Sequence, residues 1–346
     1  MTEKDLRPEN IKWDELGFDY INTDYRYLAE YKDGQWQEGK LVEDNVLHIA
    51  EGSTALHYGQ NTFEGLKAFR QEDGKINIFR PYENAKRMVN SAERLAMEPY
   101  PVDAFVEAVK QTVKANADWV PPYGSGASLY IRPLLIGVGD NIGVKPASEY
   151  LFTIFVMPVG PYYPDGMKPT KFVTTTYDRA APQGTGAAKV GGNYGGSLIA
   201  DAEAQEKGFG GAIFLDPRDH KYIEEVGSAN FFGITENDEY VTPESDSVLP
   251  GITNKSLRYL AENELGLKVS KRKIAVEEFE NFTEAGACGT AAVITPVAGI
   301  QVDDKYVPFY SEEEAGPVTQ KLYDLLLAIQ YGDVEPPEED WIVQVD

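Results

Sequence analysis

The sequence predicts an α+β protein of two domains. Its 346 residues suffice for two hydrophobic cores. Amphipathic helices and short strand-like segments follow one another without the steady βαβ alternation of a doubly wound parallel sheet. The turn-rich stretch "VGPYYPDGMKPT" at residues 159–170 separates the two halves. We therefore expect domains at 1–160 and 171–346, joined by a connection at 161–170.

The first half combines helices with long apolar strands. "KINIFR" is typical of a strand, and "YENAKRMVNSAERLAM" after it places Met88, Ala92, Leu95 and Ala96 at helical spacing. A second amphipathic helix begins near Asp103. The apolar, β-branched runs "ASLYIRPLLIGVG" and "YLFTIFVMPVG" are long enough to be buried central strands.

The second half begins with a strand and a glycine-rich loop. "KFVTTTY" is the strand, and the loop leads into a helix expected around "GSLIADAEAQEKG". Short strands are then predicted at "GAIFLD", "YIEEVG", "NFFGITEN" and "EYVTP". The helix "NKSLRYLAENELG" should end at Gly266, and "PVTQKLYDLLLAIQYG" forms the last helix.

Composition excludes several classes of function. The net charge of −24 argues against nucleic acid or a membrane surface as a partner, because both require basic surfaces. No apolar run is long enough to span a bilayer, and the amino terminus lacks a signal or transit pattern, so we expect a cytoplasmic protein. One cysteine, Cys288, and three scattered histidines predict no metal site.

The loop "GTGAAKVGGNYGGS" places one lysine, Lys189, among glycines. It does not fit a phosphate-binding P-loop, because Lys189 is followed by Val190 rather than by Ser or Thr. It also fails the dinucleotide fingerprint, since Lys189 occupies the position of the last glycine. A lone amine in such a loop is suited to a Schiff base with an aldehyde cofactor such as pyridoxal phosphate.

Such a cofactor needs further groups, and the sequence offers candidates for them. Tyr194 could hydrogen-bond the phenolic oxygen, and Glu224 or Glu225 could hold the pyridine nitrogen protonated. The turn "LPGITNKS" runs into a helix and could bind phosphate, as could the small-residue turn in "GACGTAAV". Each feature alone is more often structural. A solvated loop lysine and solvated strand glutamates therefore remain open readings.

The ordered set of motifs resembles the branched-chain amino-acid aminotransferases, which are pyridoxal-phosphate enzymes of fold type IV. The set comprises "HYGQNTFEGLKAFR", "FRPYENAKRM", "LYIRPLLIGVG", "KVGGNYGGSLIADAEA", "EEVGSANFF", "LPGIT" and "GTAAVITPV". The resemblance covers nearly the whole chain. It implies a smaller α/β N-terminal domain, a larger C-terminal pseudo-barrel domain and a homodimer.

The resemblance also assigns cofactor-binding residues. Lys189 becomes the Schiff-base lysine and moves the proton between substrate Cα and cofactor C4′. Tyr194 would bind the phenolic oxygen, Glu225 the pyridinium nitrogen, and Ser228 would keep a hydroxyl found in relatives as threonine. The remaining residues would bind the phosphate or pack on the ring: Arg87, Leu249, Ile252, Thr253 and Thr290.

For the substrate, the resemblance implies an apolar pocket that accepts leucine, isoleucine or valine, with 2-oxoglutarate as the amino acceptor. Such a pocket distinguishes one methylene only weakly. The pocket residues would be Tyr58, Phe63, Tyr130, Val144 and Tyr162. Arg132 would bind the distal carboxylate of glutamate, and the N–H groups of Thr290 and Ala291 the α-carboxylate.

Three alternatives stay open from the sequence. Two are other fold type IV enzymes, a D-amino-acid aminotransferase and an aminodeoxychorismate lyase, which share the lysine and the glutamate. The third is a non-enzymatic nucleotide-binding module that uses the glycine loop. The chain also departs from mammalian relatives, whose C-x-x-C pair is replaced here by Ala292 and Thr295.

Overall fold

The computed structural model describes residues 6–160 and 167–345. Contacts divide the chain into two compact units. The first unit comprises 1–164, 188–191 and 328–346, and the second comprises 165–187 and 192–327. Lys189 thus belongs by its contacts to the first unit, although the sequence placed it in the C-terminal domain. The predicted connection at 161–170 lies mostly outside the described residues, so that boundary stays a prediction.

The first unit is built on an antiparallel sheet in the order β18-β6-β5-β7-β8-β1-β2, with β3 beside β1 and β4 beside β7. The two long strands predicted from apolar runs, β7 and β8, pair along their whole length at its centre. The strands are β1 Arg26–Lys32, β2 Gln35–Trp36, β3 Lys40–Val42, β4 Asn61–Phe63, β5 Leu66–Arg70, β6 Ile76–Phe79, β7 Ser128–Val138, β8 Glu149–Val159 and β18 Ile342–Val345.

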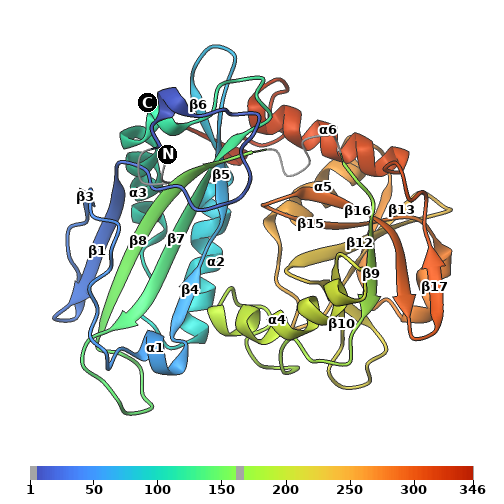
Figure 1. The fold of residues 1–346 in the computed structure, drawn as a ribbon, viewed down its shortest axis with the longest axis horizontal. Helices are drawn as coiled ribbons and strands as arrows, with labels where there is room; N and C mark the ends of the chain where they lie inside the picture. The colour runs from blue at the N-terminus through green and yellow to red at the C-terminus, as the bar shows by residue number, and fades with distance from the viewer. Residues whose placement is uncertain (1–5, 161–166, 346) are drawn as a thin grey trace. The chain divides into compact units, whose positions relative to one another are not determined.

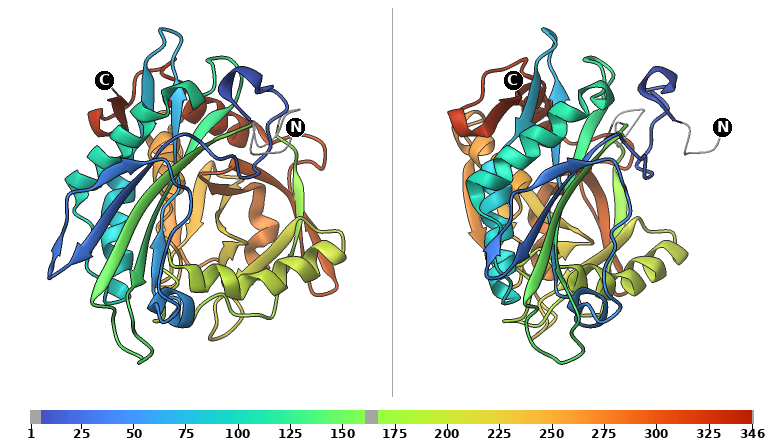
Figure 2. Two further views of the ribbon diagram at one scale, coloured as in Figure 1. Left: turned by 60° about the vertical axis from the view of Figure 1, so that its left-hand side comes forward. Right: turned by 90° about the vertical axis from the view of Figure 1, so that its left-hand side faces the viewer.

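Helices α2 (Pro81–Arg94) and α3 (Val102–Ala115) cover one face of this sheet (Figures 1 and 2). The predicted apolar stripe is confirmed there, because Met88 and Ala92 are buried in the same core as Phe152. Side chains alternate between the two faces of a strand. Since Leu129 and Ile131 lie in the helix-covered core, Tyr130 and Arg132 point to the other face. The short elements are α1 Thr54–Tyr58, η2 Pro8–Asn10, η3 Ala117–Trp119 and η5 Glu339–Trp341.

The second unit contains a closed sheet. Its strands run in the order β11-β10-β9-β16-β15-β12-β13-β14, and an additional β11–β12 pairing closes a ring (Figure 1). This confirms the pseudo-barrel that the resemblance implied. The elements are β9 Thr170–Thr174, α4 Gly191–Glu206, β10 Gly211–Leu215, β11 Ile223–Val226, β12 Ala229–Thr235, β13 Glu239–Pro243, α5 Ile252–Asn263, β14 Lys268–Arg272, η4 Val276–Asn281, β15 Phe282–Gly289, β16 Val293–Val302, β17 Lys305–Pro308 and α6 Pro317–Tyr331.

Two helix boundaries differ from the sequence prediction. Helix α4 already begins at Gly191, so Tyr194 lies in its first turn and not in a preceding loop. Gly191 packs closely on Asn61 and donates its N–H to Oδ1 at 3.1 Å, and a Cβ at position 191 would lie 2.4 Å from that oxygen and displace the side chain. Helix α5 ends at Asn263, before Gly266, which lies beyond its end with φ +68°.

None of the helices in the described part of the chain is both long and apolar enough to cross a bilayer. Within residues 6–160 and 167–345, no group of three or more His, Cys, Asp or Glu side chains is arranged to hold a metal ion.

Candidate active site

Lys189 is held by its main chain against β4 and α2 of the first unit. Its carbonyl oxygen accepts the N–H of Phe63 at 3.1 Å and the hydroxyl of Thr62 at 2.9 Å. Its N–H donates to Oγ of Ser91 at 2.9 Å. Three hydrogen bonds therefore fix the backbone, while the flexible side chain remains half-buried. This lysine is positioned by the fold and is not a solvated loop residue.

A cluster of aromatic and cationic groups surrounds the Lys189 side chain. Nζ lies 4.7 Å from the ring centroid of Phe63, and the guanidinium of Arg132 lies 4.9 Å from the same ring. Nη2 of Arg132 donates to the hydroxyl of Tyr130 at 2.9 Å. Nε of Arg132 is buried without a hydrogen-bond partner among the described residues. The structure thus brings Lys189, Phe63, Tyr130 and Arg132 together beside an unsatisfied donor suited to a carboxylate.

Arg87 is buried in α2 and forms an ion pair with Glu64. Its Nε donates to one carboxylate oxygen at 2.8 Å and its Nη2 to the other at 2.7 Å. Glu64 is fully buried and also accepts from Nδ2 of Asn84 at 2.8 Å. From helix periodicity alone Arg87 would be a solvated arginine, and that reading is wrong. The bidentate pair fixes the plane of the guanidinium in a desolvated place.

Glu225 is held at the end of β11 in the second unit. Oε1 accepts the N–H of Leu249 at 2.7 Å and Nδ2 of Asn230 at 3.4 Å. Nε of Arg179 lies 3.3 Å from Oε2, but without hydrogen-bond geometry. A buried carboxylate with a cation and N–H donors around it is stabilised as the anion.

Glu224 points elsewhere, although it is equally buried. Its Oε1 accepts the hydroxyls of Ser245 and Ser247 at 2.6 and 2.5 Å. The reading of both glutamates as solvated strand residues is therefore wrong. The separate partners agree with a structural role for Glu224 and leave Glu225 as the candidate for cofactor binding.

A two-residue hairpin follows Glu225, with Gly227 at φ +55° and Ser228 exposed at its tip. Leu249 is buried, and its carbonyl oxygen accepts Nδ2 of Asn230 at 3.0 Å. Glycine at position 251 leaves room for Asn230, because a Cβ there would lie 1.9 Å from Oδ1 of Asn230 and would displace that side chain. The hairpin and the turn are thus fastened to each other beside the carboxylate.

Ile252 and Thr253 are the first two residues of α5. Their N–H groups have no acceptor within the helix, and the positive end of the helix dipole lies there. An anion such as phosphate is stabilised at such a position. Thr290 and Ala291 form the turn between β15 and β16, next to Val293, whose φ is +64°. A β-branched residue in this strained region is rare outside functional sites.

Tyr58 and Val144 are not part of the Phe63 cluster. The Tyr58 hydroxyl instead donates to the carbonyl oxygen of Ile142, and Tyr58 is 42% exposed. Val144 is 86% exposed. Tyr162 lies outside the described residues, and Tyr194 is half-buried in α4.

Several residues that contact the predicted site residues were not predicted from the sequence. Phe18 packs edge-on against Tyr130, with ring centroids 5.0 Å apart. Arg179, Glu64 and Ser91 are ordinary polar residues in sequence, and only their buried partners reveal them. A weak signal existed for Glu64, which lies in the quoted motif "TFEGLKAFR".

Lys67 was also not predicted, since the sequence around it is that of an ordinary strand with a solvent-exposed lysine. It is 7% exposed and lies across from Tyr130 on β5. Burial lowers the pKa of its ammonium from 10.5 to about 8. Lys67 therefore introduces a second titratable amine on the sheet face that carries Tyr130.

This pKa shift makes stability depend on pH. Between pH 8 and 10.5 the unfolded chain binds more protons than the folded one, so the free energy of unfolding rises with pH in that window. We expect Lys67→Met to remove this rise and to stabilise the protein at pH 7 by about 3 kcal/mol. Urea unfolding at pH 7 and pH 10 measures both effects. An unchanged pH slope in Lys67→Met would contradict the prediction.

Comparison with known proteins agrees with this geometry. Residues 61–300 match the family model "Amino-transferase class IV". The chain belongs to the class IV aminotransferases, and it is a transaminase that uses pyridoxal 5′-phosphate.

The curated relatives narrow the family. The chain is 56% identical to a branched-chain-amino-acid aminotransferase of Haemophilus influenzae, over 98% of this chain and 100% of that one. It is also 54% identical to a branched-chain-amino-acid aminotransferase of Helicobacter pylori, over 97% of this chain and 98% of that one. Within its class, the chain therefore belongs to the branched-chain-amino-acid aminotransferases.

Solved structures give the same result for the fold. The Escherichia coli branched-chain aminotransferase matches with a TM-score of 0.78 and 29% identity, over 94% of this chain and 100% of that one. The T.th. branched-chain aminotransferase, complexed with N-(5′-phosphopyridoxyl)-L-glutamate, matches with a TM-score of 0.77 and 28% identity, over 94% and 100%.

The donor set of this chain fits pyridoxal phosphate. Arg179 has a buried, unsatisfied Nε beside Glu225, so the carboxylate has a cation behind it. The helix start at Ile252 and the buried guanidinium of Arg87 are anion-binding groups. Lys189 supplies the amine. Each chemical demand of the cofactor thus has a candidate residue.

Proposed function

We propose that this transaminase moves the amino group of L-leucine, L-isoleucine or L-valine to 2-oxoglutarate, with Lys189 as its catalytic residue. The observation that carries the proposal is the main-chain clamp on Lys189 beside Phe63 and Arg132. Assay of the purified enzyme with L-leucine and 2-oxoglutarate tests it. D-Leucine in parallel separates it from a D-amino-acid aminotransferase, and turnover of D-leucine alone would contradict it.

The cofactor, when bound, supplies an electron sink for the pair of electrons left at the substrate Cα. We assign the pyridine-nitrogen contact to Glu225, whose charge Arg179 and the N–H of Leu249 stabilise. Ile252, Thr253, Thr290 and Arg87 would bind the phosphate, and Leu249 would pack on the ring. Tyr194 would hydrogen-bond the phenolic oxygen, and Ser228 would retain the hydroxyl of its turn.

Lys189 would take the proton from the substrate Cα and return it to the cofactor carbon. Three hydrogen bonds hold its backbone, so rotation about the side-chain torsions would move Nζ between the two positions. Proton transfer by a positioned amine contributes roughly 10²–10⁴-fold to the rate. Phe63 lies beside Nζ and would shield one side of this path from water.

Two kinds of substrate would share one pocket. Phe63 and Tyr130 give it apolar walls that suit branched side chains, with Tyr58, Val144 and Tyr162 as further proposed members. Arg132 would pair with the distal carboxylate of glutamate or 2-oxoglutarate, and Thr290 with Ala291 would hold the α-carboxylate. Arg132 thereby explains how an enzyme of net charge −24 binds a dianion.

Arg132→Met is expected to separate the two half-reactions. The KM for 2-oxoglutarate should rise at least about tenfold, because a charged hydrogen bond contributes about 1.5–3 kcal/mol. The KM for L-leucine should change much less. Steady-state kinetics with each substrate varied in turn measure this, and exposed Arg218→Met is the matched control. Equal rises in both KM values would speak against the assignment.

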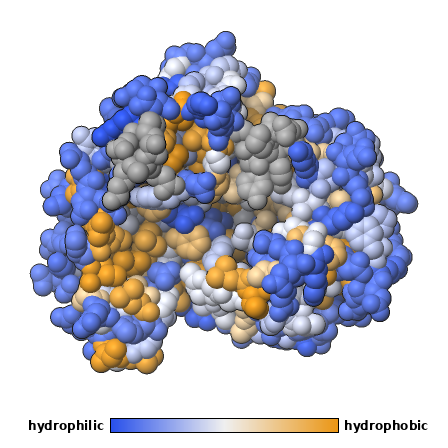
Figure 3. Space-filling view, viewed as in Figure 1, coloured by the Kyte–Doolittle hydropathy of each residue, from blue (hydrophilic) through white to orange (hydrophobic). Residues whose placement is uncertain are grey.

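We further propose a cytoplasmic homodimer. Apolar side chains lie exposed on α1 and on the loop after β7, where Figure 3 shows hydrophobic surface. Leu56, Ile142 and Val144 are 60%, 71% and 86% exposed. Such a patch favours burial against another protein surface. A second copy of this chain would cover it and bring Tyr58 and Val144 to a pocket. Sedimentation of the wild type against Ile142→Asp tests this.

A further inference from the structure

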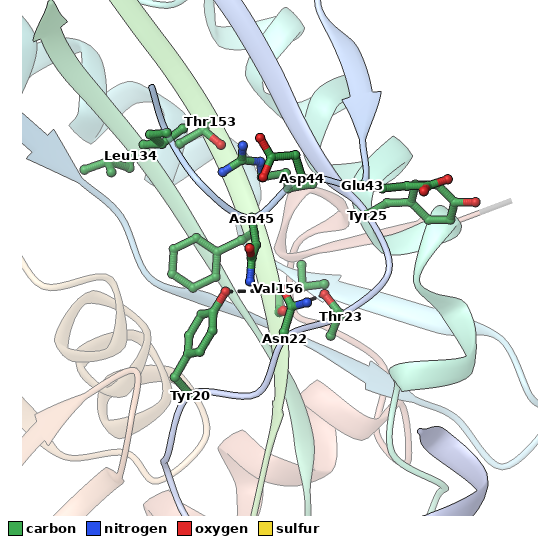
Figure 4. A pocket seen from close by; sticks show the side chains of 13 residues that line it. Tyr20, Asn22, Thr23, Tyr25, Glu43, Asp44, Asn45, Leu134, Thr153 and Val156 are labelled. Atoms are coloured by element: carbon green, nitrogen blue, oxygen red, sulfur yellow. Dashed lines mark hydrogen bonds between the residues drawn. The ribbon is translucent and has the colours of Figure 1, made fainter. Parts of the chain in front are cut away.

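We propose that the first unit carries a second small-molecule site, which binds a free α-amino acid with an apolar side chain. The site is a cavity of about 250 Å³ on the sheet face that does not carry α2 and α3. Its walls come from β7, β8, the start of β1 and the segments before β1 and after β3. In the view of Figure 4, Leu134, Thr153 and Asp44 lie toward one end of the lining, Tyr20 lies toward the other, and Asn45 lies between.

Arg26 provides the positive charge of this cavity. It is the first residue of β1 and only 8% exposed. Nη2 donates to the carbonyl oxygen of Val46 at 2.8 Å, and Nε is buried with no hydrogen-bond partner among the described residues. A desolvated guanidinium with one neutral acceptor is costly. A ligand carboxylate would compensate this cost.

Thr153 is the second unsatisfied group. It lies on β8, is 2% exposed, and its Oγ1 has no hydrogen-bond partner in the described structure. Its neighbours Phe152 and Ile154 point into the helix-covered core, so Thr153 points into the cavity. A buried orphan hydroxyl is unusual in a β-sheet. Two orphans that line one cavity indicate that the cavity has a polar occupant.

The lining of the cavity also carries two carboxylates. Glu43 and Asp44 contribute them from the segment after β3. Asp44 accepts the N–H of Val46 through Oδ1, and its Oδ2 lies 3.4 Å from Nε2 of His48, so its own turn holds the carboxylate in place. One cation and two carboxylates complement a zwitterion, with the ammonium group toward Asp44. A 2-oxo acid lacks this ammonium and would bind less tightly.

Apolar side chains complete the lining of the cavity. Leu134 and Phe155 both line the cavity, and Leu47 adds a third apolar wall. Figure 3 shows hydrophobic surface over β7 and β8 in this region. An aliphatic side chain would bury its surface here, whereas a polar amino acid would gain nothing from these walls.

The cavity adjoins the Lys189 cluster on the same face of the sheet, although the two share no residue. Leu134 of the cavity pairs directly with Phe63, and Phe155 pairs directly with Arg132. A ligand packed against Phe155 would therefore favour one position of Arg132 over another. An effect of the bound amino acid on transamination through Arg132 rests on the proposed function, while the binding of the amino acid to the cavity does not.

The test uses holoenzyme reduced with borohydride, because the cofactor is then fixed to its lysine and substrate amines cannot react. Equilibrium dialysis with labelled L-leucine should give saturable binding that approaches one molecule per chain. Arg26→Met should weaken it at least about tenfold and Thr153→Val, a nearly isosteric change, roughly threefold or more. 4-Methyl-2-oxopentanoate should compete at least about tenfold less well, since it has no ammonium.

Tyr130→Ala serves as the comparison variant, because Tyr130 is a proposed wall of the leucine pocket beside Lys189 and does not line the cavity. Binding that survives Tyr130→Ala and fails in Arg26→Met and Thr153→Val supports the second site. Absence of saturable binding, or binding lost only in Tyr130→Ala, would overturn it, and a water-filled cavity would give the first result. If reduction fixed no chromophore, the proposed function would fail, while the dialysis would still report on the cavity.

Discussion

Lys189→Ala is expected to abolish transamination while leaving the fold intact. The amine is the only group assigned to proton movement at the substrate Cα, so turnover should fall by at least roughly 10³-fold. The variant should also lose the absorbance of the lysine-bound cofactor near the visible edge. The main-chain hydrogen bonds of Lys189 do not involve its side chain, so the thermal unfolding midpoint should stay close to that of the wild type.

Exposed Lys207→Ala is the matched control, since it removes an amine just beyond α4 without touching the cluster. It should retain full activity and the full spectrum. Retained turnover in Lys189→Ala would disprove the assignment. Lost turnover together with an unchanged spectrum would also count against it, because the lysine must then act without holding the cofactor.

Much of the fold could be predicted because its elements have strong local signals. Helices α2 and α3 have clear apolar stripes, and β7 and β8 are continuous apolar runs. The sequence predicts the start of α4 five residues after its actual start at Gly191. Glycine lowers helix propensity, and the packing of Gly191 on Asn61 is not visible in the sequence. Formation of the barrel also depends on the β9–β16 and β12–β15 pairings, which join strands far apart in sequence and whose register the sequence does not reveal.

Some residues of the candidate site could likewise be found from the sequence, and others could be found only from the structure. Lys189 is unusual in its sequence context, and the resemblance named Glu225 and Arg87. Their supporting residues, Glu64 and Arg179, have no distinctive spacing, because a buried ion pair depends on tertiary contact. The reading of Arg87 as solvated failed for this reason: the helical period shows which face a residue occupies, but not that Glu64 lies against that face.

Glu225→Gln should have the second largest effect, and it distinguishes charge from hydrogen bonding. Glutamine keeps an acceptor for the N–H of Leu249 but loses the negative charge that Arg179 faces. A neutral partner no longer keeps the pyridine nitrogen protonated, so the electron sink weakens. We expect kcat to fall by roughly 10²-fold or more, as when one preorganised charge-stabilising group is removed. Single-turnover kinetics with L-leucine measure the affected step.

The neighbouring Glu224→Gln is the sharpest control that the chain offers, because both glutamates are buried side by side on β11. Glu224 binds Ser245 and Ser247, so its loss should lower stability by about 1–2 kcal/mol and leave kcat within a few fold of the wild type. If the two variants lost activity equally, burial and not contact with the cofactor would explain Glu225. A large loss of kcat confined to Glu225→Gln would instead indicate that Glu225 contacts the cofactor, since the two residues differ in their partners and not in their burial.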